Sequence, residues 1–479
     1  MEYYKSGSPA GEPLFLYGGV GLRILEAVNR FVWGVPALFM ILGVGIYLTV
    51  RTGFAQVRLF PQALRAFVGQ FRKRDNGDGV SGYRAFCTAL GATVGTGNLA
   101  GVAGAIALGG PGAIFWMWVC GILGMVTKYA EATLAVHYRQ KNQNGEFVAG
   151  PMYMILNGMG KKWSNLAGIY CFFGVVACFG VGNATQVNAV IGAIESAVIS
   201  YGFSWDLRFS VLIGVVLAVV IVWLLLGGAK GIGKAAEQLV PFAAIGYLVL
   251  SVVVLVLCRD RIPSALQSIV TGAFAPRAVT GGVVGSCFTA LRVGAARGVF
   301  TNEAGMGTAG IAHGCAIVRH PMQQGLMGVM EVFIDTIVIC TMTALVILCS
   351  DVRIPYGTDV GIQLTTEAFC SVCGNWVTAL LAGFLCLFAI ATILGWGLYG
   401  MRCAQYLFGE NTWKRFVLLQ GITVVVGALM GTGTVWLLAE IVNGLMALPN
   451  LIALIALTPQ LILLTDKKKP CLIQRSDTV

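Results

Sequence analysis

The 479-residue chain is strongly apolar: hydrophobic residues make up 57% of it, charged residues 11%, and its mean hydropathy is +0.80. Soluble domains carry about a quarter charged residues, so this composition excludes an ordinary soluble enzyme and predicts a protein of the lipid bilayer. The net charge of +11 comes from basic residues in short segments between apolar runs. Such segments set membrane orientation, so we expect no nucleic-acid partner.

Eleven apolar runs are each long enough to cross a bilayer, which takes about 20 helical residues. They lie at 31–50, 84–108, 112–136, 165–198, 209–227, 239–258, 281–312, 326–350, 376–401, 415–434 and 435–464. The sequence therefore predicts an all-α, polytopic membrane protein with 11 transmembrane helices in one hydrophobic bundle.

The lysines and arginines predict the orientation of this bundle. An odd number of spans places the two termini on opposite sides of the membrane. With the N-terminus outside, 21 lysines and arginines fall in inner segments and 8 in outer ones. The positive-inside rule then predicts an external segment over 1–30, an extra helix over 31–50 and a cytoplasmic tail over 465–479.

The first inner segment, 51–83, has a regular basic pattern. Arg51, Arg58, Arg65 and Arg72 recur every seven residues, with apolar residues between them. This pattern predicts an amphipathic helix on the inner membrane surface. A solvated cytoplasmic linker is the alternative.

Two of the predicted spans are rich in glycine. Residues 91–101 read GATVGTGNLAG, and residues 294–307 read GAARGVFTNEAGMG. Glycine disfavours helix by about 1 kcal/mol relative to alanine, so both segments are predicted breaks. Unwound backbone at membrane depth must line a cavity or be covered by protein. The alternative is close helix packing, since GxxxG spacings occur in the first segment.

The two breaks occupy matching positions in the chain. Each opens a set of five predicted helices, one covering 84–258 and the other 281–464. Because five is odd, the two sets have opposite orientations in the membrane. Inverted repeats that begin with an interrupted helix are typical of secondary transporters, whose binding site lies near the bilayer midplane.

An interrupted helix offers N–H groups to an anion and carbonyl groups to a cation, which suits a zwitterionic amino acid with sodium. Thr93, Thr96 and Asn98 add neutral oxygens of the kind that hard cations prefer. No cluster of histidine, cysteine and carboxylate residues indicates a transition-metal site, and no acid–base pair indicates an enzyme.

Ionisable residues within the spans are further candidates for function. Arg297, Glu303 and Asp335 lie in or after the second break. Arg297 and Glu303 either contact the substrate or form a structural pair. Lys128 and Glu131 are three residues apart near an inner helix end, where we expect a snorkelling pair.

Six motifs in order resemble the alanine or glycine:cation symporter family. They are RTGFAQVR (51–58), VGTGNLAGVA (94–103), GGPGAIFWMWV (109–119), GPMYMI (150–155), RGVFTNEAGMG (297–307) and ILGWGLYG (393–400). The resemblance implies a sodium-driven symporter of alanine, glycine or similar amino acids. It also implies the LeuT-type fold, with a 5+5 inverted repeat preceded by one extra helix.

Locally, GATVGTGN also resembles the unwound first core helix of the neurotransmitter:sodium symporters. That resemblance implies that the N–H groups of Thr96 and Gly97 hold the substrate carboxylate. The implied sodium ligands are the carbonyls of Gly91 and Val94 and the side chains of Asn98 and Thr392. The implied pocket lining is Phe179, Gln186, Phe300, Met306 and Trp396.

The expected function is import of small neutral amino acids across the plasma membrane, with sodium as the co-transported ion and no other cofactor. A sodium-coupled carrier of a larger neutral amino acid such as glutamine is one alternative. A passive channel or a receptor on the same fold is another. Channels need a ring of carbonyls or charges along a continuous pore, and no such pattern stands out in the sequence.

The charge asymmetry makes the orientation testable. A single cysteine introduced as Ser8→Cys should react with an impermeant thiol reagent added to intact cells, whereas Lys73→Cys and Thr478→Cys should react only after permeabilisation. These labelling experiments need a background in which the native cysteines are unreactive. Labelling of Lys73→Cys from outside would refute the predicted orientation.

Overall fold

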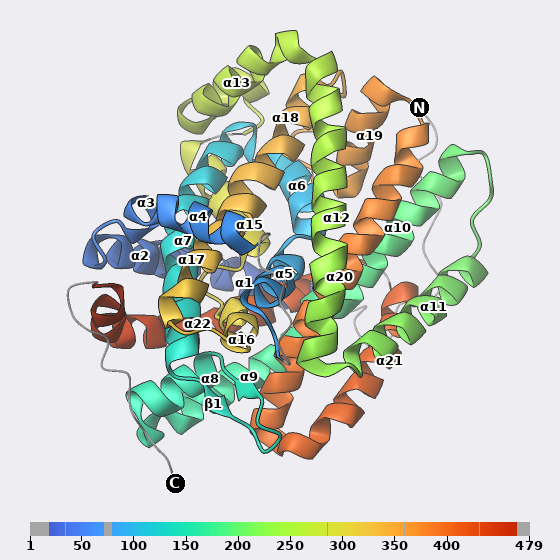
Figure 1. The fold of residues 1–479 in the computed structure, drawn as a ribbon. Helices are drawn as coiled ribbons and strands as arrows, with labels where there is room; N and C mark the ends of the chain where they lie inside the picture. The colour runs from blue at the N-terminus through green and yellow to red at the C-terminus, as the bar shows by residue number, and fades with distance from the viewer. Residues whose placement is uncertain are drawn as a thin grey trace.

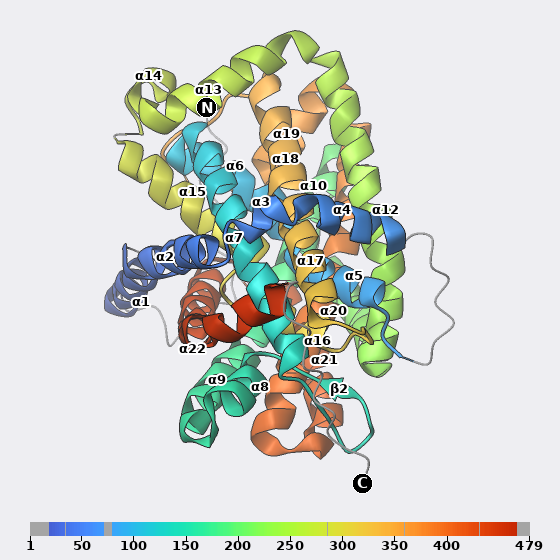
Figure 2. The same cartoon turned by 60° about the vertical axis from the view of Figure 1, so that its left-hand side comes forward.

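The computed structural model describes residues 19–33, 35–70, 79–284, 286–358, 360–430 and 432–466 as an almost wholly helical bundle (Figures 1 and 2). A short antiparallel pair of strands, β1 (Gln140–Lys141) and β2 (Phe147–Val148), interrupts the helices. Arg72 of the predicted basic helix and the ranges 1–18 and 467–479 of the predicted termini lie outside the described residues.

Eight helices of the described chain are long and apolar enough to cross a membrane. They are Gly112–His137, Lys161–Ser200, Leu207–Leu225, Gly228–Leu257, Pro321–Cys349, Trp376–Phe408, Glu410–Leu429 and Glu440–Thr465. A broken pair, Gly82–Thr93 and Gly97–Gly109, makes nine if it is one span. The predicted all-α, polytopic class is confirmed at this level, and the count of eleven stays a prediction.

Most of these spans are single labelled helices in Figure 1. They are α7 (Gly112–His137), α11 (Leu207–Leu225), α12 (Gly228–Leu257), α20 (Trp376–Phe408), α21 (Trp413–Leu429) and α22 (Thr432–Thr465). Two spans are interrupted by a π-helical turn: α9 (Ser164–Phe179) with α10 (Thr185–Ser200), and α17 (Pro321–Val332) with α18 (Thr341–Cys349). The bundle therefore follows the predicted apolar runs closely.

Four helices precede the first broken span: α1 (Gly19–Val32), α2 (Val35–Arg51), α3 (Ala55–Arg58) and α4 (Phe60–Gln70). The 17 residues of α2 are fewer than the about 20 that a bilayer needs. Arg58 and Arg65 are exposed on α3 and α4, while Leu59 and Ala63 are buried. The basic segment is therefore helical and amphipathic, and its position on the membrane surface stays a prediction.

Three short helices lie in segments that the sequence analysis left as loops. They are α13 (Ile262–Phe274), α14 (Pro276–Thr280) and α19 (Ile362–Cys373). Each has fewer than 14 residues, too few to cross a bilayer and therefore invisible to a search for spans. A Pro at or near the first turn starts α13 and α14, where its fixed φ suits a helix and its missing N–H costs nothing.

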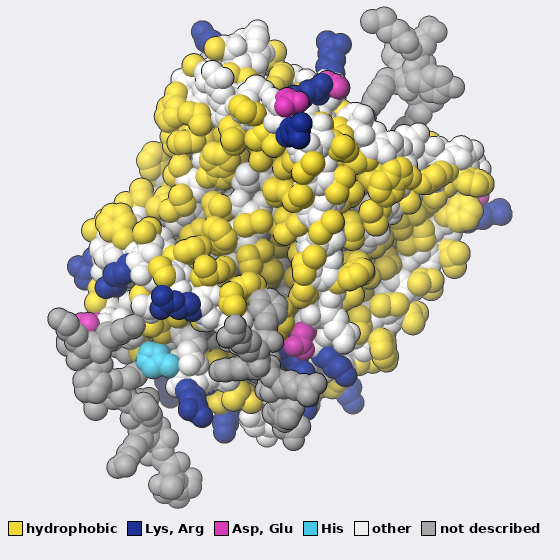
Figure 3. Space-filling view, turned by 45° about the horizontal axis from the view of Figure 1, so that its top comes forward, with side chains coloured by type: hydrophobic (Ala, Val, Ile, Leu, Met, Phe, Trp, Pro, Cys, Tyr) yellow, Lys and Arg dark blue, Asp and Glu magenta, His cyan; other side chains and the backbone are white. Residues whose placement is uncertain are grey.

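The outer surface carries large apolar side chains where a soluble protein would carry charges. Trp223 on α11 is 73% exposed and Phe242 on α12 is 68% exposed. In Figure 3, hydrophobic side chains cover most of the visible face, and most Lys and Arg side chains lie toward its upper and lower margins. A surface of this kind is stable only against lipid, so the chain is a multi-pass membrane protein.

Both predicted helix breaks are present. The first lies between α5 (Gly82–Thr93) and the π-helical η2 (Gly97–Gly101), which continues as α6 (Val102–Gly109), and the two halves are bent by 48°. The second separates α15 (Cys287–Asn302) from α16 (Thr308–Gly314). Glu303, Gly305 and Gly307 of this break have positive φ angles of 54°, 98° and 77°, which no right-handed helix allows.

The second break is shorter than its glycines suggested. The α15 helix continues through Gly294 and Gly298 and packs there against α7. A Cβ atom on Gly294 would lie 2.2 Å from the carbonyl oxygen of Ala113, and one on Gly298 would lie 3.1 Å from Cβ of Cys120. These two glycines serve close packing, the alternative considered from the sequence, and the break is confined to 303–307.

A fully buried ionic network joins α7, α16 and α17. Lys128 Nζ lies 2.9 Å from Glu331 Oε1, and Glu331 Oε2 lies 3.0 Å from Nε2 of His313. All three side chains are at most 1% exposed. The prediction that Lys128 snorkels with Glu131 to an inner helix end was wrong, because both are buried and Lys128 pairs with a residue of another helix.

This network makes a stability prediction. Glu331→Gln removes the carboxylate that contacts the buried Lys128 ammonium at 2.9 Å and should cost about 3 to 5 kcal/mol. The double variant Lys128→Met with Glu331→Met removes both charges and should recover most of that loss. The measurement is thermal unfolding in detergent, which is monitored as the decrease of the monodisperse protein peak with temperature.

The control is Glu237→Gln, which breaks the Arg84–Glu237 pair at 2.9 Å, with side chains 19% and 33% exposed. Its loss should cost about 1 kcal/mol or less, because solvent screens the pair. A Glu331→Gln protein as stable as the parent would contradict the assignment of Lys128 and Glu331 as a stabilising pair.

Candidate functional site

The first break meets α20 through a group of oxygen atoms. The Thr392 hydroxyl donates a hydrogen bond to the carbonyl of Gly91 at 2.9 Å and lies 3.5 Å from the carbonyl of Val94. The carbonyl of Val94 is available because the helix ends at Thr93. Oxygen ligands converging in this way suit a hard cation such as sodium.

Asn98, the fourth predicted sodium ligand, makes different contacts. Its side-chain oxygen accepts a hydrogen bond from the N–H of Gly95 at 2.9 Å, and its Nδ2 donates to Oδ1 of Asp335 at 2.7 Å. The structure therefore brings Gly91, Val94 and Thr392 together and places Asn98 beside the buried Asp335. This splits the predicted ligands into two groups.

The second break is held by two buried carboxylates. Oε1 of Glu131 on α7 accepts hydrogen bonds from the N–H groups of Gly305 and Gly307 at 2.9 and 3.0 Å. Oε1 of Glu303 accepts one from Nε1 of Trp396 at 2.9 Å, and its Oε2 accepts one from the Thr308 hydroxyl at 2.7 Å. Hydrogen bonds therefore hold the second break to α7 through Glu131 and to α20 through Trp396.

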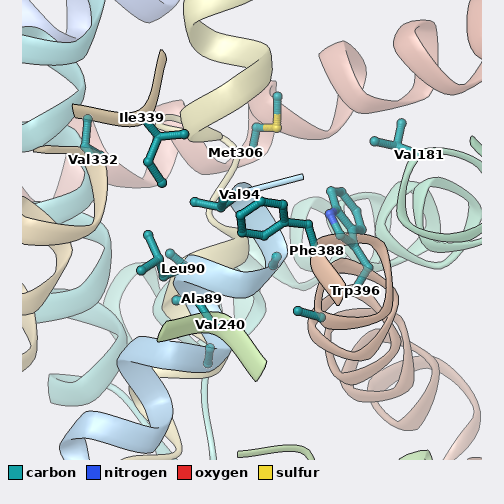
Figure 4. Close-up of a cluster of buried hydrophobic side chains, with 14 of the residues drawn as sticks. Ala89, Leu90, Val94, Val181, Val240, Met306, Val332, Ile339, Phe388 and Trp396 are labelled. Carbon is teal, nitrogen blue, oxygen red and sulfur yellow. The ribbon is translucent and has the colours of Figure 1, made fainter. Parts of the chain in front are cut away.

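A small cavity of about 20 Å³ lies between the two breaks. It is lined by Ala92, Thr93, Gly95, Thr96, Gly97, Val181, Gln186, Phe300, Glu303, Thr392 and Trp396. Figure 4 shows Trp396 and Phe388 of α20 beside Val94 of the first break, with Met306 and Val181 nearby. This volume holds about one water molecule, so the cavity is narrower than an amino acid as it stands.

Two polar atoms of the cavity lining have no partner among the described residues. They are the hydroxyl oxygen of Thr96 and Oε1 of Gln186, whose side chains are 1% and 4% exposed. The other end of the Gln186 amide donates to the carbonyl of Val181 at 3.2 Å. Nearly all buried polar groups in proteins are hydrogen-bonded, so two unpaired atoms facing one cavity point to a polar ligand.

Five of the seven predicted substrate residues line this cavity: Thr96, Gly97, Gln186, Phe300 and Trp396. The other two are not among its lining residues. The centroid of the Phe179 ring lies 5.3 Å from that of Phe416, and Met306, within the second break, is fully buried. Aromatic and thioether side chains near a break can pack in the core or contact a ligand. A resemblance between motifs does not distinguish these two roles.

Glu303 is the one charged residue among the described residues of the lining, and the predicted set of site residues left it out, as it did Ala92, Thr93, Gly95 and Val181. The sequence carried a signal for Glu303, because an ionisable side chain within a membrane span is a functional candidate by default. Of the two alternatives considered for Glu303 from the sequence, the structural pair with Arg297 does not form. Arg297 lies 3.5 Å from Glu440 of α22, in a second, outer cavity.

The outer cavity has a volume of about 220 Å³ and is more open. Its lining residues are Asn29, Trp33, Leu108, Arg292, Val293, Ala296, Arg297, Phe300 and Glu440. Phe300 lines both cavities, so its side chain forms the wall between them. The arrangement is a small inner pocket with a larger cavity beside it, whose lining includes Arg292, Arg297 and Glu440.

Comparison with known proteins agrees with this architecture. The Sodium:alanine symporter family model matches residues 20–470. The chain is 40% identical to the sodium/alanine symporter AgcS of Methanococcus maripaludis, over 91% of this chain and 95% of that protein. It is 44% identical to an uncharacterized transporter of Haemophilus influenzae, over 91% and 93% of the two chains.

A further relative, from Bacillus subtilis, is named "Probable sodium/glutamine symporter GlnT" and is 36% identical over 91% of this chain and 88% of its own. Among solved structures, MhsT in complex with L-phenylalanine aligns with a TM-score of 0.56 and 14% identity, covering 80% of this chain and 97% of that one. This likeness establishes a shared LeuT-type fold. The chain belongs to the sodium:alanine symporter family.

Proposed function

We propose that this protein imports small neutral amino acids, with alanine and glycine as its substrates, in symport with sodium. The observation that carries the proposal is the small cavity between the two breaks, where Thr96 and Gln186 each present an unpaired polar atom. The cavity of about 20 Å³ holds about one water molecule as it stands, so it must widen even for alanine, and a small substrate needs the least widening. Alternating access would open the cavity to each side in turn.

We propose that sodium binds where the carbonyls of Gly91 and Val94 meet the Thr392 hydroxyl, with the Asp335 carboxylate, which Nδ2 of Asn98 contacts, as a second source of oxygen ligands. The N–H groups of Thr96 and Gly97 would hold the substrate carboxylate. Support comes from the break itself, which places a helix N-terminus and free carbonyls in one place.

The matching breaks also support the inverted repeat. We propose that 84–258 and 281–464 are its halves, that α2 is the extra helix, and that eleven spans result. The N-terminus would lie outside and the C-terminus in the cytoplasm of the cell whose plasma membrane holds the protein. The second candidate substrate is glutamine, which the name of the Bacillus subtilis relative favours.

Uptake into proteoliposomes tests the symport. A zwitterion that travels with one sodium ion gains about 2.3 kcal/mol per 100 mV of membrane potential. A tenfold sodium gradient adds about 1.4 kcal/mol, and together they support accumulation of about five-hundredfold. Alanine should therefore overshoot its equilibrium level when sodium is outside, and a negative interior should enlarge the overshoot.

Protein-free liposomes and a potassium-for-sodium exchange are the controls. Alanine uptake that stops at its equilibrium level would indicate a channel and would refute the symporter proposal. An overshoot driven by a proton gradient and not by sodium would keep the transporter and change the coupling ion. A panel of labelled amino acids in the same assay separates alanine and glycine from glutamine.

The sodium site predicts a selective effect at Thr392. Thr392→Val keeps the side-chain shape and removes its oxygen, so the sodium concentration for half-maximal uptake should rise by about tenfold, or 1.4 kcal/mol. Thr392→Ser keeps the oxygen, so its sodium concentration for half-maximal uptake should stay near that of the parent. An unchanged sodium dependence in Thr392→Val would move the site elsewhere.

The pocket predicts a change of selectivity at Trp396. Trp396→Ala enlarges the cavity, so glutamine uptake relative to alanine should rise by about tenfold. Trp396→Phe keeps most of the volume but loses the hydrogen bond to Glu303, and it should leave this ratio close to that of the parent. The same substrate profile in Trp396→Ala, at normal expression, would make Trp396 a packing residue only.

A further inference from the structure

We propose that the Glu303 carboxylate receives the ammonium group of the transported ligand and thereby selects substrates with a primary ammonium group. This inference rests on the proposed function and adds the residue that distinguishes an amino acid from a simple carboxylic acid of the same size. None of the predicted substrate or sodium ligands carries a negative charge, so that set alone leaves the ammonium end of a zwitterion without a counter-charge.

The geometry of Glu303 places its carboxylate at the cavity. The residue is 3% exposed and lines the inner pocket with Thr96, Gly97 and Gln186. Its two oxygens each accept one hydrogen bond, from Trp396 and from Thr308. A carboxylate has about four acceptor positions, so further donors from a ligand can be accommodated.

The charge of Glu303 has no counter-charge in direct contact. Among the described residues, no lysine, arginine or histidine nitrogen lies within 4.0 Å of its carboxylate oxygens. Lys128 is committed to Glu331 at 2.9 Å, and Arg297 lies against Glu440. The donors from Trp396 and Thr308 are neutral. Lys128 acts on Glu303 only from beyond 4.0 Å. A buried carboxylate with no cation in contact is costly, and a ligand cation in contact lowers that cost.

The two breaks are close enough for one small molecule to bridge them. A Cβ atom on Gly97 would lie 3.1 Å from Cγ2 of Thr301 and 3.5 Å from Cδ1 of Phe300. Gly97 belongs to the first break, while Phe300, Thr301 and Glu303 form the end of α15 at the second. A zwitterion could therefore place its carboxylate on the first break and its ammonium group on the second.

The backbone of Glu303 is a second, independent sign of function. Its φ and ψ of 54° and 19° are left-handed, and Phe54 is the other non-glycine residue with positive φ among those described. Glycine would adopt this conformation without strain, as Gly305 and Gly307 do two and four residues later. Strain of this kind persists where the side chain has a task that glycine cannot perform.

Two other roles for the carboxylate make different predictions. If Glu303 held sodium, removing its charge would weaken sodium binding. If Glu303 were a neutral acid, the substitution Glu303→Gln would have little effect on the affinity for any ligand. If it paired with an ammonium group, only ligands that carry this group would be weakened.

The test compares alanine with propionate, which is alanine without its ammonium group, in the full-length protein and in Glu303→Gln. Glutamine keeps an acceptor for Trp396 and removes the charge. The rise in melting temperature with ligand concentration, at saturating sodium, gives an apparent Kd for each ligand. A sodium titration without organic ligand gives the apparent sodium Kd, and Glu410→Gln at the exposed 3-10 turn after α20 controls for net charge.

In the parent protein, alanine should bind at least about tenfold more tightly than propionate, a difference of about 1.4 kcal/mol. In Glu303→Gln, the alanine Kd should rise by at least about tenfold while the propionate and sodium values stay near those of the parent. This loss of the alanine-to-propionate ratio is an effect that a structural role would not produce.

Equal weakening of both ligands, an unchanged alanine Kd or a selective loss of sodium binding would each overturn the inference and leave the symporter proposal intact. If Glu303→Gln does not fold, the parent protein still decides, because equal affinity for alanine and propionate refutes ammonium recognition. A parent that binds neither alanine nor glycine would overturn the proposed function itself, and this inference with it.

Discussion

One carboxylate oxygen pairs with the unwound, buried backbone of the second break. Oε1 of Glu131 accepts hydrogen bonds from the N–H groups of Gly305 and Gly307 and from Nδ2 of Asn450 at 2.8 Å. An unpaired N–H group within a bilayer costs several kcal/mol, so an interrupted span needs such a partner inside the protein. With the break fixed in this way, Phe300 and Glu303 at its start lie along the inner cavity.

The surrounding interactions divide the helices around the cavity. On one side, Glu131 and the Lys128–Glu331–His313 network join α7, α16 and α17 through buried charges. On the other side, α20 reaches the two breaks through single neutral donors, from Thr392 to Gly91 and from Trp396 to Glu303. The polar links from α20 to the breaks are therefore single hydrogen bonds from neutral donors, whereas α7, α16 and α17 are joined by buried charges.

Sequence reasoning succeeded where the local chain decides the outcome. Bilayer thickness fixes the length of a span, so the apolar runs matched the helices, and the glycines near Val94 and Gly305 marked real breaks. It failed for Gly294 and Gly298, because a glycine favours a break and a close helix contact equally. Only the position of α7 against α15 shows that these two serve contact.

The sequence by itself therefore determined the membrane class, the approximate spans, the two breaks and the family motifs. The tertiary structure decided which side chains meet: Lys128 pairs with Glu331, 203 residues away, and not with Glu131, while Glu303 pairs with Trp396 and not with Arg297. It also placed Phe179 away from the inner cavity and Glu303 within it. The physical reason is that a buried polar group takes its partner from whichever helix lies beside it, and helix neighbours are set by packing across the whole bundle.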